Sequence, residues 1–271
     1  MRMEAEGMRE DKNPLSSKEE LIAGNLDTSF LKILALIFML IDHLGAAIFT
    51  DIPELRVIGR MAFPLYAWCL VVGSVKTSSP VRYGIRLLLM AVISQPIYMM
   101  ALNHTWSEMN ILFTLLIALI AIQGIRANWM GSQFWVPAIC YIACGFLKVD
   151  YGWKGVTFIL FLYLARENRA GLCATYLAYA LFWGTTSSVV RSFLGIILPF
   201  ESMGGLGTVL SSFFRLQSMV WLSLPLIVFS TNSQLRLPKW LGYGLYPMHL
   251  VLLIVIKLLN GYTVQMLMNV F

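Results

Sequence analysis

Charged residues are scarce in this 271-residue chain, in which Asp, Glu, Lys and Arg together make up 13% of the positions. A soluble domain has about 25% charged residues, so the side chains that would cover a water-soluble globule are missing. Hydrophobic residues reach 58%, and the mean hydropathy is +0.73. Apolar stretches approaching the roughly 20 residues that cross a bilayer as a helix recur along the chain. The composition excludes an ordinary soluble domain and predicts an all-α, polytopic transmembrane helix bundle.

Cysteine and histidine are also rare, with four and three residues in the chain. The cysteines lie inside apolar stretches. Cys140 and Cys144 share a helical face at a spacing of four, but no histidine or carboxylate lies beside them to complete a metal site. We interpret them as packing residues and predict no metal. The formal net charge of +6 comes mainly from short connections between apolar stretches, a pattern that indicates membrane topology and no nucleic-acid partner.

Residues 1–29 are rich in charged side chains and lack the apolar segment of a secretory signal. We expect them to form a polar, disordered tail, followed by one transmembrane domain at residues 30–271. Lys76, Arg82 and Arg86 form a cationic cluster after the second apolar stretch. Cationic loops of membrane proteins stay in the cytoplasm, so this connection and the N-terminus are both predicted to be cytoplasmic.

The apolar stretches predict roughly nine transmembrane spans. Glycines and Pro199 interrupt the apolar pattern after residue 185, so we expect a re-entrant or interfacial segment near residues 188–211. The expected spans are residues 30–49, 55–75, 81–101, 111–125, 134–147, 156–164, 172–183, 213–229 and 241–259.

Three ionisable residues lie inside the first two spans: Asp42 and His43 in the first and Arg60 in the second. Each costs about 2.5–3.5 kcal/mol in a bilayer and needs a partner, a water-filled cavity or a function. His43 and Arg60 are equally far from the centre of the turn between the spans, so the three side chains can share one layer toward the outer face. We expect Asp42 to pair with Arg60 and His43 to face a cavity, because sequence neighbours point in different directions. The alternative is a polar staple that only holds the hairpin together.

Further polar residues are candidates for binding a substrate. Asn110 opens the fourth span and is alternatively only its N-cap, and Tyr151 is alternatively an aromatic residue of the membrane interface. His249 follows Pro247, which frees a backbone carbonyl in the last span, so a structural hydrogen bond is the alternative there. The candidates are Asn110, Thr114, Asp150, Tyr151 and His249.

Two strings in the first hairpin, residues 31–45 and 56–64, place charged residues where an ordinary apolar helix would have none. Together with residues 110–115, 150–155 and 245–250 they resemble the TraX family of multi-pass membrane proteins, in the family's order. The last string alone is weak, because other membrane acyltransferases have similar endings. Gln95-Pro96 departs from the Glu-Pro pairing of many relatives, so a role for an acid at this position does not carry over.

The resemblance implies an acetyltransferase of the bacterial cytoplasmic (inner) membrane that uses acetyl-CoA as co-substrate. The best-known member of the family acetylates the N-terminus of conjugative pilin, and larger related enzymes acetylate glycans from a cytoplasmic donor. The expected partners are therefore acetyl-CoA, an acceptor protein N-terminus or envelope glycan, and the lipid bilayer. The acceptor, the acyl chain length and the oligomeric state do not follow from the sequence.

We hypothesise that His43 is the general base toward an acceptor amine or hydroxyl, with a transient acetyl-histidine as a variant. Arg60, held by Asp42, would stabilise charge on the thioester carbonyl or position an acceptor anion. His249 in the inner half and His43 in the outer half would bracket the path of the donor. Lys76, Arg82 and Arg86 are candidates for binding donor phosphates, unless they only mark a cytoplasmic loop.

Two other classes of function fit the same residues. A transporter or flippase also uses charged intramembrane residues and helices broken by proline, although we find no inverted repeat between the two halves of the chain. In a purely structural membrane subunit, Asp42, His43 and Arg60 would only hold helices together. Acetyl transfer from a labelled donor separates these alternatives.

Overall fold

The computed structural model describes residues 21–268, apart from the side chains of residues 239 and 240. Within this range the chain is mostly helical, as predicted. The helices in chain order are α1 (Thr28–Ala47), α2 (Pro53–Gly59), α3 (Ala62–Lys76), α4 (Pro80–Leu102), α5 (Ile111–Ala127), α6 (Ser132–Phe146), α7 (Gly152–Ala165), α8 (Arg169–Gly184), η1 (Phe200–Met203), α9 (Gly204–Phe213), η2 (Ser218–Ser223), α10 (Leu224–Val228), α11 (Lys239–Leu259) and α12 (Val264–Met268). Four two-residue strands complete the structure: β1 (Glu108–Met109), β2 (Lys148–Val149), β3 (Ser192–Phe193) and β4 (Ile196–Ile197).

Side-chain caps explain where several helices begin. Asp27, Ser79, Asn110 and Asn168 each accept a hydrogen bond from a backbone N–H in the first turn of the helix that follows, which satisfies one of the free donors at a helix start. Helix α4 ends where Asn103 adopts a left-handed conformation with φ 57°, a role for which asparagine is well suited. The polar residues between apolar stretches therefore define the helix boundaries.

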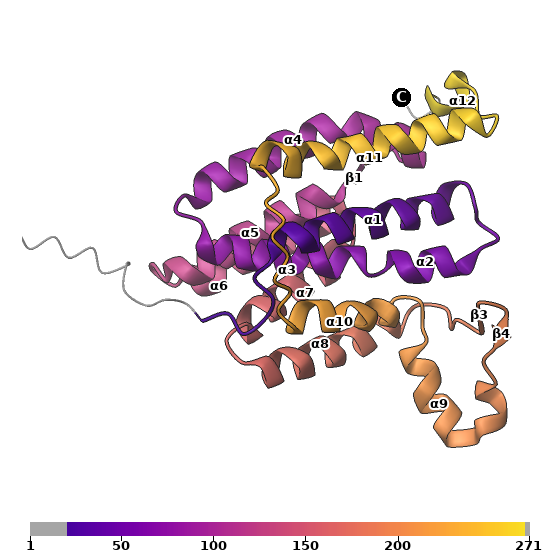
Figure 1. Ribbon diagram of the computed structural model, residues 1–271. Coiled ribbons are helices and arrows are strands. Elements are labelled where there is room, and N and C mark those ends of the chain that lie inside the picture. Colours follow the sequence, from indigo (N-terminus) through magenta and orange to yellow (C-terminus); the bar gives the residue numbers. More distant parts are fainter. Residues whose placement is uncertain (1–20, 269–271) are drawn as a thin grey trace, which may run out of the picture.

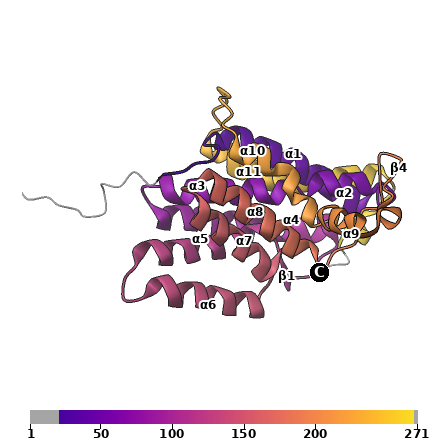
Figure 2. The same ribbon diagram turned by 90° about the horizontal axis from the view of Figure 1, so that it is seen from below.

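Helix α3 lies at the centre of the bundle. In the segment Pro53–Lys76, 72% of the apolar window is buried inside the protein, against 28% for α1. Helices α1, α5 and α7 pack against α3, and its Phe63 and Trp68 are fully buried. The long helices run side by side, with α6 at one edge of the bundle (Figures 1 and 2).

Four helical segments are long and apolar enough to cross a membrane: Thr28–Ala47, Pro53–Lys76, Pro80–Leu102 and Leu241–Leu259. Four further apolar segments are shorter: Ile111–Ala127, Ser132–Phe146, Gly152–Ala165 and Ser218–Val228. The prediction of a helical membrane protein, made from composition, is confirmed. The count of nine spans is not confirmed.

The second predicted span is broken in the middle. Helix α2 ends at Gly59 and α3 begins at Ala62, so Arg60 lies at the junction. Pro64 is four residues after Arg60 and has no N–H with which to bond the Arg60 carbonyl, which interrupts the ladder at this point. From this junction the Arg60 guanidinium reaches Asp42 of α1.

The segment after α8, which was predicted to be re-entrant or interfacial, is built from short elements. Residues 188–211 contain the short antiparallel hairpin β3–β4, then η1 and α9, and they extend from the end of the bundle where α2 begins (Figure 1). Leu194 and Gly195, at the hairpin turn, both have positive φ. The span predicted at residues 213–229 is shortened to η2 and α10, residues 218–228.

The predicted tail, residues 1–29, is described only in part. Residues 1–20 lie outside the described residues, whereas residues 21–27 pack against the bundle. Asn25 is fully buried, its backbone N–H donates to Ile227 at 2.6 Å, and its carbonyl accepts from the Trp68 indole at 2.7 Å. These bonds connect the segment before α1 to α3 and α10.

Candidate functional site

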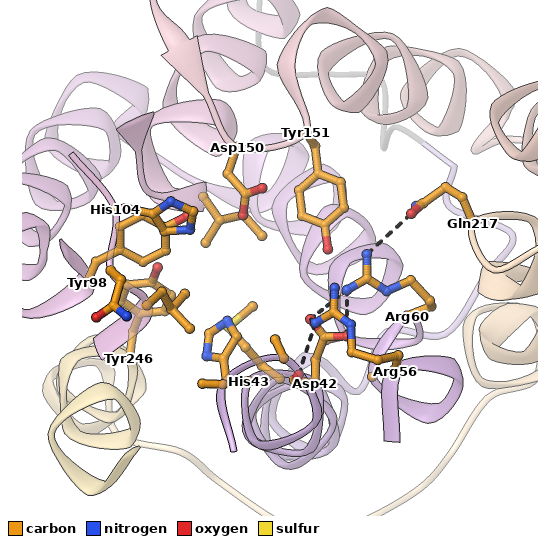
Figure 3. Close-up of a pocket in the computed structure, with 18 of the residues that line it drawn as sticks. Asp42, His43, Arg56, Arg60, Tyr98, His104, Asp150, Tyr151, Gln217 and Tyr246 are labelled. Carbon is orange, nitrogen blue, oxygen red and sulfur yellow. Dashed lines mark hydrogen bonds and ion pairs between the residues drawn. The ribbon is translucent and has the colours of Figure 1, made fainter. Parts of the chain in front are cut away.

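A cavity of about 550 Å³ lies between α1, α2, α4 and α11, at the end of the bundle where α2 begins. We call it the Asp42 cavity. Its polar side chains come from six parts of the chain, and those labelled in Figure 3 point toward one another. They are Asp42, His43, Arg56, Arg60, Tyr98, Asn103, His104, Asp150, Tyr151, Gln217, Tyr246 and Lys257.

Asp42 and Arg60 form the predicted ion pair. Arg60 Nη2 lies 2.5 Å from both carboxylate oxygens of Asp42, and each of these two residues is less than a tenth exposed. Gly59 makes this approach possible, since a Cβ at this position would lie 2.3 Å from the Asp42 Cβ. Arg60 Nη1 also donates to Gln217 Oε1 at 3.3 Å, which connects the pair to the segment before η2.

Arg56 is a second cation on the same carboxylate, and it was not predicted. Its Nη1 donates to Asp42 Oδ2 at 2.7 Å and to the Asp42 carbonyl at 3.0 Å. Arg56 precedes Arg60 by four residues, so both guanidinium groups are on one face of the chain. The spacing of four residues is the sequence feature from which Arg56 could have been predicted. In the structure the two cations share the single carboxylate of Asp42.

His43 lines the cavity, and it stacks on His249 with ring centroids 5.2 Å apart and 20° between the planes. Among the described residues, His43 Nδ1 is buried without a hydrogen-bond partner. Both ring nitrogens of His249 are buried too; carbonyls of Tyr246 and Leu245 are close by, but neither completes a hydrogen bond with good geometry. The structural hydrogen bond considered for His249 is therefore not formed within the described residues.

The predicted separation of the two histidines in depth is wrong. The backbone N–H of Leu237 donates to Ser29 Oγ at 3.2 Å, so α1 and α11 start at the same level. His43 lies 14 residues after Ser29 and His249 lies 12 residues after Leu237, which correspond to helix rises of about 21 and 18 Å. The imidazoles therefore meet in one layer and do not bracket a path.

Asp150 and Tyr151 line the cavity from the connection between β2 and α7. The Asp150 backbone N–H donates to Met109 at 2.9 Å, beside the parallel pairing of β1 with β2. Burial raises the pKa of the Asp150 carboxyl to about 6, although the Arg60 guanidinium opposes the shift. Tyr151 has φ 62°, uncommon for a bulky residue, and its ring stacks on Phe63 with centroids 4.2 Å apart.

Asn110 and Thr114 do not line the cavity. Asn110 is fully buried, and its side-chain amide bonds the Ala91 carbonyl, Gln95 Oε1 and the Leu112 N–H. Asn110 is therefore the N-cap of α5, which was the alternative to a role in substrate binding. The Thr114 hydroxyl donates to the Asp150 carbonyl. The polar atoms of both side chains are therefore occupied by hydrogen bonds to other parts of the protein. Through these bonds both residues hold the loops of the cavity in place.

A second cavity, of about 340 Å³, lies between α1, α3, α4 and α11 and extends toward the end of the bundle where α3 ends. We call it the Lys76 cavity. Lys76, Arg86 and Lys32 line it, whereas Arg82 lies outside on the exposed first turn of α4. Tyr246 lines both cavities, so its ring separates them.

The remaining residues of the Asp42 cavity had no place in the sequence analysis. His104 stacks on Tyr98 with ring centroids 4.9 Å apart and pairs with Glu108 at 3.3 Å. Gln217 immediately precedes the shortened span, and Lys257 is near the end of α11. Among residues 21–268, no group of three or more His, Cys, Asp or Glu side chains could hold a metal ion.

Long apolar helices around a buried cluster of charged residues define a polytopic helical membrane protein with an internal polar site. The chain belongs to the TraX family, whose model, described as TraX protein, matches residues 27–257. It is 32% identical over 173 residues to the probable fimbrial assembly protein FimC, serogroup H1, of Dichelobacter nodosus, an alignment that covers 58% of this chain and 70% of the relative. It is 22% identical over 240 residues to the uncharacterized protein RP591 of Rickettsia prowazekii (strain Madrid E), covering 86% of this chain and 91% of the relative. No solved structure matches.

Proposed function

We propose that this protein is a membrane acetyltransferase that moves an acetyl group from acetyl-CoA to an amine or hydroxyl acceptor in the Asp42 cavity. The observation that carries the proposal is His43, whose buried Nδ1 has no hydrogen-bond partner among the described residues, in a cavity beside two guanidinium groups. Membership of the TraX family and similarity to a relative named for fimbrial assembly support a role at the cell envelope.

The reaction needs a base, and His43 supplies it. As the acceptor oxygen or nitrogen attacks the thioester carbonyl, the imidazole takes the acceptor proton. The carbon–sulfur bond then breaks, and the imidazolium returns the proton to the thiolate of coenzyme A. His249 stacks against the ring and acts as a positioning residue.

Arg60 and Arg56 stabilise the oxyanion that forms during this attack. Donors fixed in advance in a site of low dielectric are effective, because they do not have to reorganise as charge develops. Asp42 fixes both guanidinium groups at 2.5 and 2.7 Å, and Tyr151 approaches them from the opposite wall (Figure 3).

The donor enters through the Lys76 cavity. Lys76, Arg86 and Lys32 line it, and they give it the charge that suits the phosphates of coenzyme A, with Arg82 at the exposed rim. The pantetheine arm then passes Tyr246, which borders both cavities, to present its thioester to His43. The proposal places the Lys76 cavity and the N-terminus in the cytoplasm and the Asp42 cavity toward the outer face of the bacterial inner membrane.

The proposal retains the nine-span topology. The four long and four shorter apolar segments, together with α8 (Arg169–Gly184), supply nine helical segments in the predicted order. The short ones tilt little and require a thinner bilayer or water-filled cavities around the site.

A transporter or flippase is the second candidate, and one observation favours it. Two cavities reach toward opposite ends of the bundle and share Tyr246 as a lining residue. Alternating access needs such an arrangement around a central site. A transporter would move its substrate without consuming acetyl-CoA.

The test uses purified protein in lipid nanodiscs, with radiolabelled acetyl-CoA and a panel of envelope acceptors. We expect donor-dependent labelling of an acceptor and a loss of about 100-fold or more in His43→Gln, the usual contribution of a general base. His104→Gln alters another imidazole of the same cavity and should cost far less, because His104 already pairs with Glu108.

Thermal unfolding of each variant separates lost chemistry from lost folding. The catalytic assignment is wrong if folded His43→Gln transfers label as fast as the wild type. A wild type that transfers no label to any acceptor, yet moves a solute across a vesicle membrane, would replace the enzyme with the transporter.

A further inference from the structure

Lys257 is a buried cation at the edge of the Asp42 cavity. It lies in the last turn of α11, its residue is 1% exposed, and its side chain lines the cavity. Its ammonium lies 5.4 Å from the centroid of the Tyr262 ring, and within residues 21–268 no carboxylate pairs with it. A lysine near a helix C-terminus is stabilised by the helix dipole, but that effect does not require burial in a cavity.

The fixed charges of the cavity leave it positive. Arg56 and Arg60 share the single carboxylate of Asp42, and Lys257 adds a third cation. The other carboxylate in the lining is Asp150, whose pKa is raised to about 6 by burial. A protonated amine entering this space would meet net repulsion, whereas an anion would be attracted.

The position of Lys257 suits a group beside the reacting atoms. Lys257 lies eight residues after His249 on α11, a rise of about 12 Å. The Lys257 side chain nevertheless lines the same cavity as His43. Tyr262, whose hydroxyl donates to the Ala47 carbonyl at 3.3 Å, closes this side between α11 and α1.

We propose that the Asp42 cavity binds an anionic hydroxyl acceptor, a sugar that carries a carboxylate or a phosphate, and that Lys257 binds the anionic group. This inference rests on the proposed acetyl transfer and narrows its acceptor to a negatively charged glycan component. Arg60 and Arg56 remain at the reacting carbonyl, and Lys257 holds the acceptor by a second point, which fixes the orientation of its hydroxyl toward His43.

The test separates binding from transfer. Nanodisc-embedded protein without donor is titrated calorimetrically with matched sugars: glucosamine (cationic), N-acetylglucosamine (neutral), N-acetylmuramic acid (carboxylate) and N-acetylglucosamine 6-phosphate (phosphate). Lys257→Met removes the charge and keeps most of the side-chain volume, and Lys257→Arg keeps the charge. Lys148→Met makes the same change at an exposed lysine of β2 that lies outside both cavities.

We expect one or both anionic sugars to bind at least about tenfold more tightly than the neutral one, the usual effect of a charge-assisted hydrogen bond. Lys257→Met should abolish this preference, Lys257→Arg should retain most of it, and Lys148→Met should leave it unchanged. The carboxylate and phosphate arms show which anion is preferred.

Equal affinity for neutral and anionic sugars, or tighter binding of glucosamine, would overturn the inference. So would a preference for anions that survives in folded Lys257→Met. Transfer of label is measured separately with the same sugars. Anion binding without transfer to these sugars or to any of the envelope acceptors would refute the proposed acetyltransferase and leave the anion site standing. Transfer without an anion preference would support the acetyltransferase and overturn the anion site.

Discussion

Asp42 holds two guanidinium groups inside the bundle, so replacing it by Asn tests the electrostatic design of the site. The variant leaves Arg60, 8% exposed, without a countercharge, and breaking a buried ion pair from one side costs about 3–5 kcal/mol. The Arg56 side chain is 31% exposed, so solvent can stabilise its charge when the Asp42 carboxylate is gone. Loss of the Arg56–Asp42 pair therefore adds little to the destabilisation. We therefore expect Asp42→Asn to lower the free energy of unfolding by about 3 kcal/mol, the lower end of that range.

For a chain of this size, 1 kcal/mol changes the melting temperature by about 2–4 °C, so Asp42→Asn should melt about 6–12 °C below the wild type. The assay is thermal unfolding in detergent, followed by intrinsic fluorescence. The double variant Asp42→Asn with Arg60→Gln removes the orphaned cation and should recover part of the loss, because contacting residues are not additive. A shift below about 1 °C, or strict additivity in the double variant, would refute this account of the pair.

Two further predictions concern the same cavity. Gly59→Ala should destabilise the protein by about 1–3 kcal/mol, because its new Cβ would lie 2.3 Å from the Asp42 Cβ, while Gly145→Ala, with nothing within 4 Å, should be neutral in the same unfolding assay. The pKa of the Asp150 carboxyl is raised in the folded protein to about 6 from 3.8. Between these two pH values folding takes up a proton, so the contribution of Asp150 to the free energy of unfolding falls as pH rises from about 4 to 6. Asp150→Asn should remove that part of the pH dependence, and melting curves at pH 4.5 and 7 that change equally in both proteins would contradict it.

The sequence predicted the first part of the site because helix geometry alone relates Asp42 to Arg60. Equal distances from a tight turn place two residues at one depth without knowledge of the rest of the fold. Arg56 follows from the same helix geometry, because its spacing of four from Arg60 puts both cations on one face, although it lies nearer the turn and was not predicted. The predicted all-α class is likewise a matter of composition and needs no tertiary contacts.

Other parts depend on contacts between distant segments, which a single sequence does not show. The depth of His249 is set by the bond from Leu237 to Ser29, 208 residues apart in the chain. A lysine near the end of an apolar helix usually extends to the membrane surface, so nothing local indicated that Lys257 would be buried. Asn110 had two possible roles: its Oδ1 caps α5 through the Leu112 N–H, and Ala91 and Gln95 on α4 take up its amide donors, which keeps it out of the cavity.

The break at Arg60 connects these observations. An unpaired guanidinium inside a bilayer would cost several kcal/mol, and Arg60 avoids this cost by pairing with Asp42. Pro64 ends the hydrogen-bond ladder at the Arg60 carbonyl, and Gly59 admits α1 to contact distance. Two cations therefore reach one carboxylate in the cavity that His43 lines, and they give this cavity its charge. Pro64→Ala supplies an N–H that can bond the Arg60 carbonyl, and we expect this bond to move Arg60 away from Asp42 and to lower the melting temperature measured by thermal unfolding.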